Sequence, residues 1–362
     1  MVEVVNEEPM EPEQSTSAHA NEEPPGGMGS RGHRSGGGQA ASTSRRGHLP
    51  LLDLLRLVAG LSVVHHHMTR GLLFGVGLGL PLFLVLFFAL AAISTKQEGL
   101  PGKLRRKGGD LIVPWLRWSV SYVLLLIVTD SVRGGGPTER LEIAMLWTGG
   151  HPALWFLPFA TAALLPAHAL GRLLRDVPRP PAVLILIACA FAATAAAHVA
   201  LRHGVPDPWS SWVRSSPAVP WGLAVGTACR AGSPGRRRGL LTLISASAVL
   251  GYFAFPEVAH PDDLPRRMAV AVPLVCLGFT YRGALPDAVR RLAVLSFGVY
   301  LVHPFVGKVL IELFDVLSWP PVVHGLVAWS ISLALVQVAR SSGLRWRELR
   351  PDPPAKRPTV GS

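Results

Sequence analysis

Charged side chains are scarce in this chain of 362 residues. Asp, Glu, Lys and Arg together make up 16% of the sequence, whereas soluble domains average about 25%. Hydrophobic residues make up 49% of it. The deficit of charge excludes an ordinary soluble globular protein and favours a protein that lies largely in the lipid bilayer.

Cysteine is rarer still. The three cysteines, Cys189, Cys229 and Cys276, all lie in apolar stretches. They are too few for a disulfide framework, and their surroundings do not fit a zinc site. We therefore expect the thiols to pack in the core, and we predict neither a metal site nor a bound cofactor.

Acidic residues are outnumbered by basic ones, at 23 Asp and Glu against 35 Lys and Arg, which gives a formal net charge of +12. In a soluble protein this balance would indicate a nucleic-acid partner. Here most of the basic residues lie in the two terminal segments and in alternate connections between apolar segments. Cytoplasmic loops of membrane proteins carry such an excess. We therefore predict that these connections and both termini are cytoplasmic, and that nucleic acid is not a partner.

Apolar segments dominate residues 49–340 and predict an all-α, polytopic integral membrane protein with about ten transmembrane helices in the cell membrane. The predicted spans are Leu49–Met68, Leu72–Ile93, Leu111–Val128, Leu154–Leu174, Ala182–Leu201, Pro217–Cys229, Leu240–Phe255, Met268–Tyr281, Leu292–Phe314 and Val322–Val338. Residues 1–48 are polar, and we expect them to form a disordered cytoplasmic segment without a cleaved signal peptide. Residues 341–362 form a predicted basic cytoplasmic tail.

Ionisable residues interrupt the first predicted span, LPLLDLLRLVAGLSVVHHHM. Each costs roughly 2.5–3.5 kcal/mol or more at the bilayer centre, so such residues indicate function. Arg56 and His67 share one helical face, because eleven steps of ~100° return to within ~20° of the start, roughly 16 Å further along the axis. His65 and His66 point elsewhere, and three adjacent histidines make a poor metal site. Asp53 lies one turn before Arg56 and can pair with it.

Four segments of the chain carry a resemblance to a known family. They read LDLLRLVAGLSVVHHH, KLRRKGGDLIVPWL, ALWFLPFATAAL and LSFGVYLVHPFV, in that order. With them the chain resembles the membrane acyltransferase 3 family, integral membrane O-acyltransferases that modify sugars, polysaccharides and antibiotics. The resemblance covers most of residues 49–340 and implies the same ten-helix layout.

The resemblance implies an acyltransferase that moves a short acyl group, such as acetyl, from acyl-CoA to a hydroxyl of a carbohydrate, a cell-surface polysaccharide or a glycosylated metabolite. It implies that His67 is the base that deprotonates the hydroxyl and that Arg56 positions the donor or stabilises charge. The expected substrate-binding residues are Asp53, Arg105, Arg106, Trp155, Tyr300 and His303. The composition, rich in Ala, Gly and Arg, favours a bacterial cell membrane. A pairing with a soluble transferase encoded elsewhere stays open.

Each of these residues also has a structural interpretation. Asp53 and Arg56 can form an ion pair at a helix end, and His67 can be an interfacial histidine without chemistry. His303 precedes Pro304 and can satisfy a carbonyl that the proline leaves free. Arg105 and Arg106, with Lys107, fit the excess of cytoplasmic charge, and Trp155 fits an interfacial belt.

Two other functions stay open. A proton-coupled transporter also buries ionisable residues, but it gathers them with broken helices near the midplane. A catalytically inactive family member would act in binding or assembly. The second span keeps the latter open, because Phe87 and Phe88 stand near the place where the family usually carries Ser-Gly.

Overall fold

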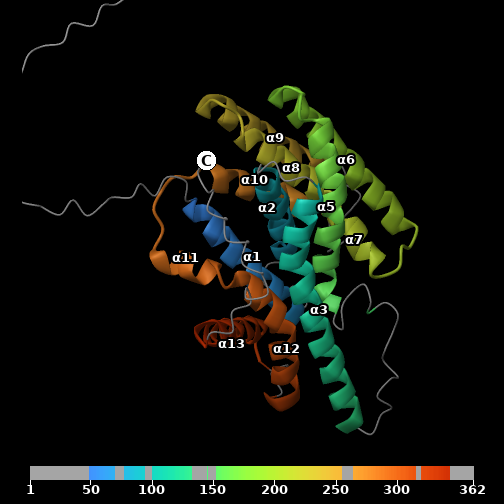
Figure 1. Cartoon of the computed structure of the whole chain (residues 1–362), viewed down its shortest axis with the longest axis vertical. Helices are drawn as coiled ribbons and strands as arrows, with labels where there is room; N and C mark the ends of the chain where they lie inside the picture. The colour runs from blue at the N-terminus through green and yellow to red at the C-terminus, as the bar shows by residue number, and fades with distance from the viewer. Residues whose placement is uncertain are drawn as a thin grey trace, which may run out of the picture. The chain divides into compact units, whose positions relative to one another are not determined.

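A computed structural model describes residues 49–69, 77–93, 100–132, 145, 152–254, 264–314 and 319–342, within the compact unit His48–Ser362. The described residues form helices and connections without a strand, so the all-α prediction is confirmed for them (Figure 1). The helices are α1 (Pro50–Thr69), α2 (Gly79–Ile93), α3 (Leu100–Val132), η1 (Pro152–Trp155), α5 (Phe156–Leu173), α6 (Arg179–Arg202), α7 (Trp209–Ser215), α8 (Ala218–Cys229), α9 (Pro234–Ala254), α10 (Leu264–Thr280), α11 (Asp287–Ala293), α12 (Ser296–Phe314) and α13 (Pro321–Ser341). The predictions for residues 1–48 and for nearly all of the tail lie outside the described residues.

Each predicted apolar segment overlaps a helix, but the ninth differs from its prediction. Leu292–Phe314 was expected as one span, whereas the structure has two helices, α11 and α12, whose axes differ by 58°. A second difference is α7, a seven-residue helix that hydropathy does not mark. Its sequence, WSSWVRS, mixes aromatic and polar residues, so no long apolar window includes it.

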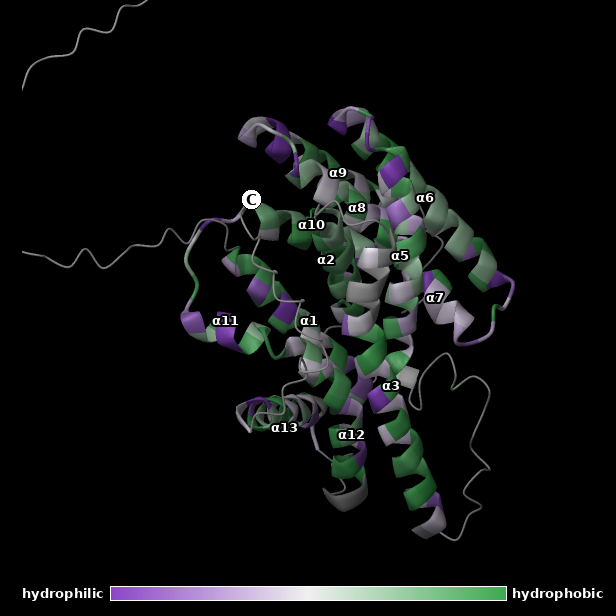
Figure 2. Cartoon of the chain, viewed as in Figure 1, coloured by the Kyte–Doolittle hydropathy of each residue, from purple (hydrophilic) through white to green (hydrophobic). Residues whose placement is uncertain are grey.

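Four helices in the described residues are long and apolar enough to cross a membrane. They are Gly109–Ser131, Ala153–Leu173, Arg179–Arg202 and Val322–Ser341. The bent pair of α11 and α12 makes a fifth if it is one span, and α2 is apolar but shorter. In Figure 2 hydrophobic colours cover most of α2, whereas hydrophilic colours mark the ends of α6 and α9. The protein is therefore a membrane protein by the length and composition of these helices.

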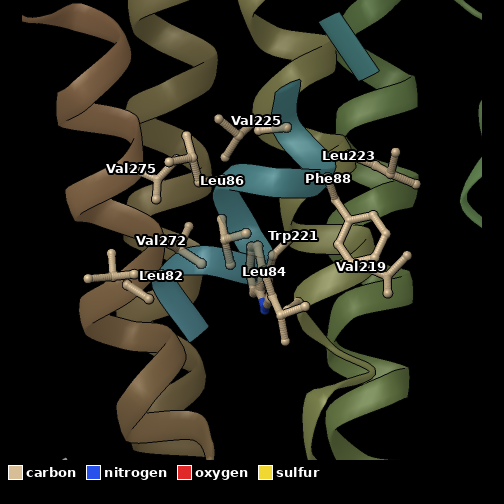
Figure 3. Packing of buried hydrophobic residues seen from close by; sticks show 14 of the residues in the cluster. Leu82, Leu84, Leu86, Phe88, Val219, Trp221, Leu223, Val225, Val272 and Val275 are labelled. Atoms are coloured by element: carbon tan, nitrogen blue, oxygen red, sulfur yellow. The ribbon is translucent and has the colours of Figure 1, made fainter. Parts of the chain in front are cut away.

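The core lies where α2 packs on α8 and α10 (Figure 3). Two glycines of α8 allow this approach: a Cβ added to Gly222 would lie 2.7 Å from the Val85 carbonyl oxygen, and one on Gly226 would lie 2.6 Å from that of Ala89. Small residues commonly permit such close packing in membrane helices. Phe88 is fully buried here, beside Gly222. Phe88, which stands near the place where the family usually carries Ser-Gly, is thus a packing residue.

Candidate functional site

Helices α1 and α12 lie side by side and run in the same direction. A Cβ on Gly60 of α1 would lie 3.7 Å from the Cβ of Ser296 in α12. Seven residues further along both helices, the rings of His67 and His303 have centroids 5.3 Å apart and planes inclined by 33°. Two helical turns on one helix therefore match two turns on the other, and this register brings the two histidines together.

The hydrogen bond made by His303 fixes which of its nitrogens carries the proton. Its Nδ1 lies 2.7 Å from the Tyr300 carbonyl oxygen, and because a carbonyl only accepts, Nδ1 donates. The neutral ring then carries its lone pair on Nε2. Tyr300 is four residues before Pro304, which has no N–H to offer that carbonyl. The structural interpretation of His303 therefore fits the geometry, and the same buried ring also faces the exposed His67.

Tyr122 of α3 completes the backbone hydrogen bonding around Pro304. The Phe305 N–H donates to the Tyr122 hydroxyl at 2.9 Å, and that hydroxyl donates to the Leu301 carbonyl at 3.2 Å. A side chain inserted in this way is a recognised cause of a helix kink. Tyr122 therefore ties α12 to α3 within one turn of His303.

Tyr300 joins α12 to the segment that contains Trp155. The Tyr300 hydroxyl donates to the Ala153 carbonyl in η1, and its ring meets Phe156 edge to face at 5.2 Å between centroids. Trp155 is half-buried, and its ring packs on Phe159 at 5.9 Å. Two of the sequence motifs thus meet at Tyr300, whose hydroxyl is engaged with the backbone.

Asp53 and Arg56 form the expected ion pair at the opposite end of α1. Arg56 Nη1 lies 3.0 Å from Asp53 Oδ1, and the Arg56 side chain is 37% exposed against 11% for Asp53. Arg56 lies about 16 Å from His67 along the helix axis. The structure therefore does not bring Arg56 and His67 into contact, but places two polar groups at the two ends of one helix.

Comparison with known protein families decides which family these residues belong to. The model of the acyltransferase 3 family, described as an acyltransferase domain, matches residues 49–339. The chain belongs to this family. It is therefore an acyltransferase and a membrane protein. No curated protein and no solved structure matches the chain.

Two further predicted residues of the acyltransferase lie in α3. Arg105 and Arg106 belong to the first part of α3, but their side chains lie outside the described residues. His65 is buried against Gly325 of α13, where an added Cβ would lie 2.8 Å from the His65 ring. Among the described residues, no three His, Cys, Asp or Glu side chains are placed to hold a metal ion.

Sequence reasoning missed two residues of the candidate site. Tyr122 lies in an apolar span and has no motif around it. The signal that could have pointed to it is Pro304 in another span, because a neighbouring side chain must satisfy the backbone groups that a proline leaves free. Ser296 was noted only as part of a motif. Its side chain is 4% exposed, and its hydroxyl has no hydrogen-bond partner among the described residues.

Proposed function

We propose that this acyltransferase moves a short acyl group, such as acetyl, from acyl-CoA to a hydroxyl of a carbohydrate, a cell-surface polysaccharide or a glycosylated metabolite at a bacterial cell membrane. The observation that carries the proposal is the pair of His67 and His303. Acyl transfer to a hydroxyl needs a positioned base. His67 is exposed and accessible to an acceptor, while buried His303 holds one tautomer beside it.

The proposed reaction needs no cofactor. His67 takes the proton of the acceptor hydroxyl, and the oxygen attacks the thioester carbonyl carbon. The carbon–sulfur bond then breaks, and the departing thiolate of CoA takes the proton from His67. A second imidazolium near His67 would oppose the charge that His67 gains in this step, so a neutral His303 suits the reaction.

In this proposal Arg56 acts on the acyl-CoA donor. Its guanidinium is partly exposed and is oriented by Asp53, which supports a role in positioning the donor or stabilising its charge. Arg105 and Arg106 would hold the phosphates of CoA. Trp155 and Tyr300 would shape the wall of the site next to His303 through the contacts of η1 and α5.

Ten membrane spans with both termini in the cytoplasm are part of the proposal. The directions of three helices support it. Tyr122 of α3 contacts the middle of α12. Further along both helices, Lys308 Nζ of α12 lies 3.5 Å from Thr129 Oγ1 of α3. Helices α1, α3 and α12 therefore run in the same direction, as the first, third and ninth spans of an alternating topology must.

One observation favours a transporter as the second candidate. The break between α11 and α12 is of the kind that transporters use near the membrane midplane. The ionisable residues do not gather there, because Arg56 and His67 lie about 16 Å apart along α1. Acyl transfer therefore remains the function that the geometry supports better.

Replacement of His67 tests the proposed function. We expect His67→Ala to lower kcat for acyl transfer from acetyl-CoA by about 10²–10⁴-fold, because a positioned general base contributes that much. The purified protein would be reconstituted in lipid nanodiscs with an oligosaccharide acceptor, and release of the CoA thiol would be measured. His198→Ala, which changes a half-buried histidine of α6, is the matched control and should keep the wild-type rate. Wild-type turnover by His67→Ala would show that the base is elsewhere.

A further inference from the structure

Because the chain breaks between α11 and α12, helix α12 begins at a residue whose side chain is buried in the protein. Helix α12 begins at Ser296, opposite Gly60 in the middle of α1, and Figure 1 shows α11 meeting it at an angle. At membrane depth, interrupted helical backbone is tolerated only where the protein buries it or where it lines a water-filled cavity. At the start of α12 the Ser296 side chain is buried, whereas Phe297 and Gly298 are partly exposed.

Several hydrogen-bond donors at this start have no acceptor among the described residues. The first backbone bond at this end of α12 runs from Val299 N–H to the Leu295 carbonyl at 2.9 Å. The N–H groups of Ser296, Phe297 and Gly298 find no acceptor in the described part of the chain. The Ser296 hydroxyl is also without a partner there, although its side chain is 4% exposed. A buried hydroxyl without a hydrogen-bond partner is unfavourable, so a ligand that supplies an oxygen to Ser296 would be favoured.

The spacing along α12 indicates which oxygen of the donor would reach these groups. Ser296 and His303 are seven residues apart, which is about 10 Å along the helix. If the thioester lies at His67 beside His303, the donor needs an acceptor atom at about that distance from its sulfur. In an extended chain each bond adds about 1.2 Å. The carbon of the second amide carbonyl of the pantetheine arm is eight bonds from the sulfur, so this carbonyl is about 10 Å away.

We infer that the Ser296 hydroxyl and the free N–H groups at the start of α12 bind the second amide carbonyl of the pantetheine arm of acyl-CoA. The inference rests on the proposed function. The positive end of the helix dipole favours an oxygen acceptor there. Burial favours the neutral carbonyl over a phosphate, because a buried charge without a paired cation is far more costly.

Binding of free coenzyme A to Ser296→Ala tests this subsite. Titration calorimetry in nanodiscs should give a Kd about fivefold higher than that of the wild type, which corresponds to the loss of one net hydrogen bond. Adenosine 3′,5′-bisphosphate, which lacks the arm, should bind both proteins equally. Ser332→Ala is the control, because it removes a fully buried serine of α13 whose hydroxyl donates to the Ala328 carbonyl at 2.7 Å. This control should bind coenzyme A as the wild type does.

Several outcomes would overturn the subsite. One is a wild-type Kd for coenzyme A in Ser296→Ala, and another is an equal loss of affinity for the bisphosphate. Ser296→Cys, of similar size but a weaker donor, should also bind coenzyme A less tightly and guards against misfolding of the alanine variant. The two proposals fail separately: a wild type that binds coenzyme A but transfers no acyl group refutes the function alone. A wild type that does not bind coenzyme A refutes both.

Discussion

The three adjacent histidines of α1 face different surroundings. His65 is buried against Gly325 of α13, whereas His67 is exposed and lies against His303 of α12. The ring of His66 meets that of His67 edge to face, with centroids 5.6 Å apart. Because successive residues turn by about 100° around a helix, adjacent histidines of one apolar helix reach different neighbours.

At this scale His303 has a role that a stability measurement can isolate. His303→Ala leaves the Tyr300 carbonyl without its donor, because Pro304 has no N–H. We expect a loss of about 1–3 kcal/mol, the usual cost of an unsatisfied buried group. His303→Asn, whose amide can donate from nearly the same place, should recover part of the loss. Thermal unfolding in detergent would measure both, and equal melting temperatures for alanine and asparagine would contradict the structural role.

Helices in this protein are held by close backbone approach and by a few polar insertions. Tyr122 enters the hydrogen-bond ladder of α12 at Pro304. Gly222 and Gly226 let α8 pack directly on the backbone of α2. Both devices replace the hydrophobic driving force that helices lack against lipid. The position of α12, and with it that of His303, thus depends on contacts made by other helices.

A larger residue in α8 should separate it from α2. In Gly222→Ala the new Cβ would lie 2.7 Å from the Val85 carbonyl and 2.6 Å from the Phe88 Cβ, so backbone must move. We expect a destabilisation of about 1–3 kcal/mol, as for other overpacked cores. Gly239→Ala in α9 is the control, because nothing lies within 4 Å of its added Cβ. If both variants unfold at the same temperature, the close approach of the two helices is not important for stability.

The whole molecule is an acyltransferase whose described part contains four or five helices suited to cross a membrane. Helices α1, α3 and α12 run in the same direction, and the histidine pair lies between α1 and α12. If they are alternating spans, the Asp53–Arg56 pair lies toward the cytoplasm and His67 toward the outer side. A donor and an acceptor would then approach from opposite faces.

Labelling of introduced cysteines tests this topology. Arg106→Cys should react only with reagents on the cytoplasmic side, and Asp262→Cys only with those on the outer side, since the charge distribution predicts opposite locations. The experiment would use whole cells and a membrane-impermeant maleimide, in a background where Cys189, Cys229 and Cys276 are replaced. Labelling of both positions from one side would contradict the ten-span arrangement.

The sequence by itself determined the class of the protein, the positions of its apolar helices, the pairing of Asp53 with Arg56 and the shared face of Arg56 and His67. These depend on hydropathy and on the period of the α-helix, which act over a few residues. The tertiary structure alone decided that His67 meets His303, that Tyr122 enters α12 and that the ninth apolar segment breaks before Ser296. Such features arise from contacts between residues far apart in the chain, and no local pattern encodes which distant side chain will fill a gap in a helix.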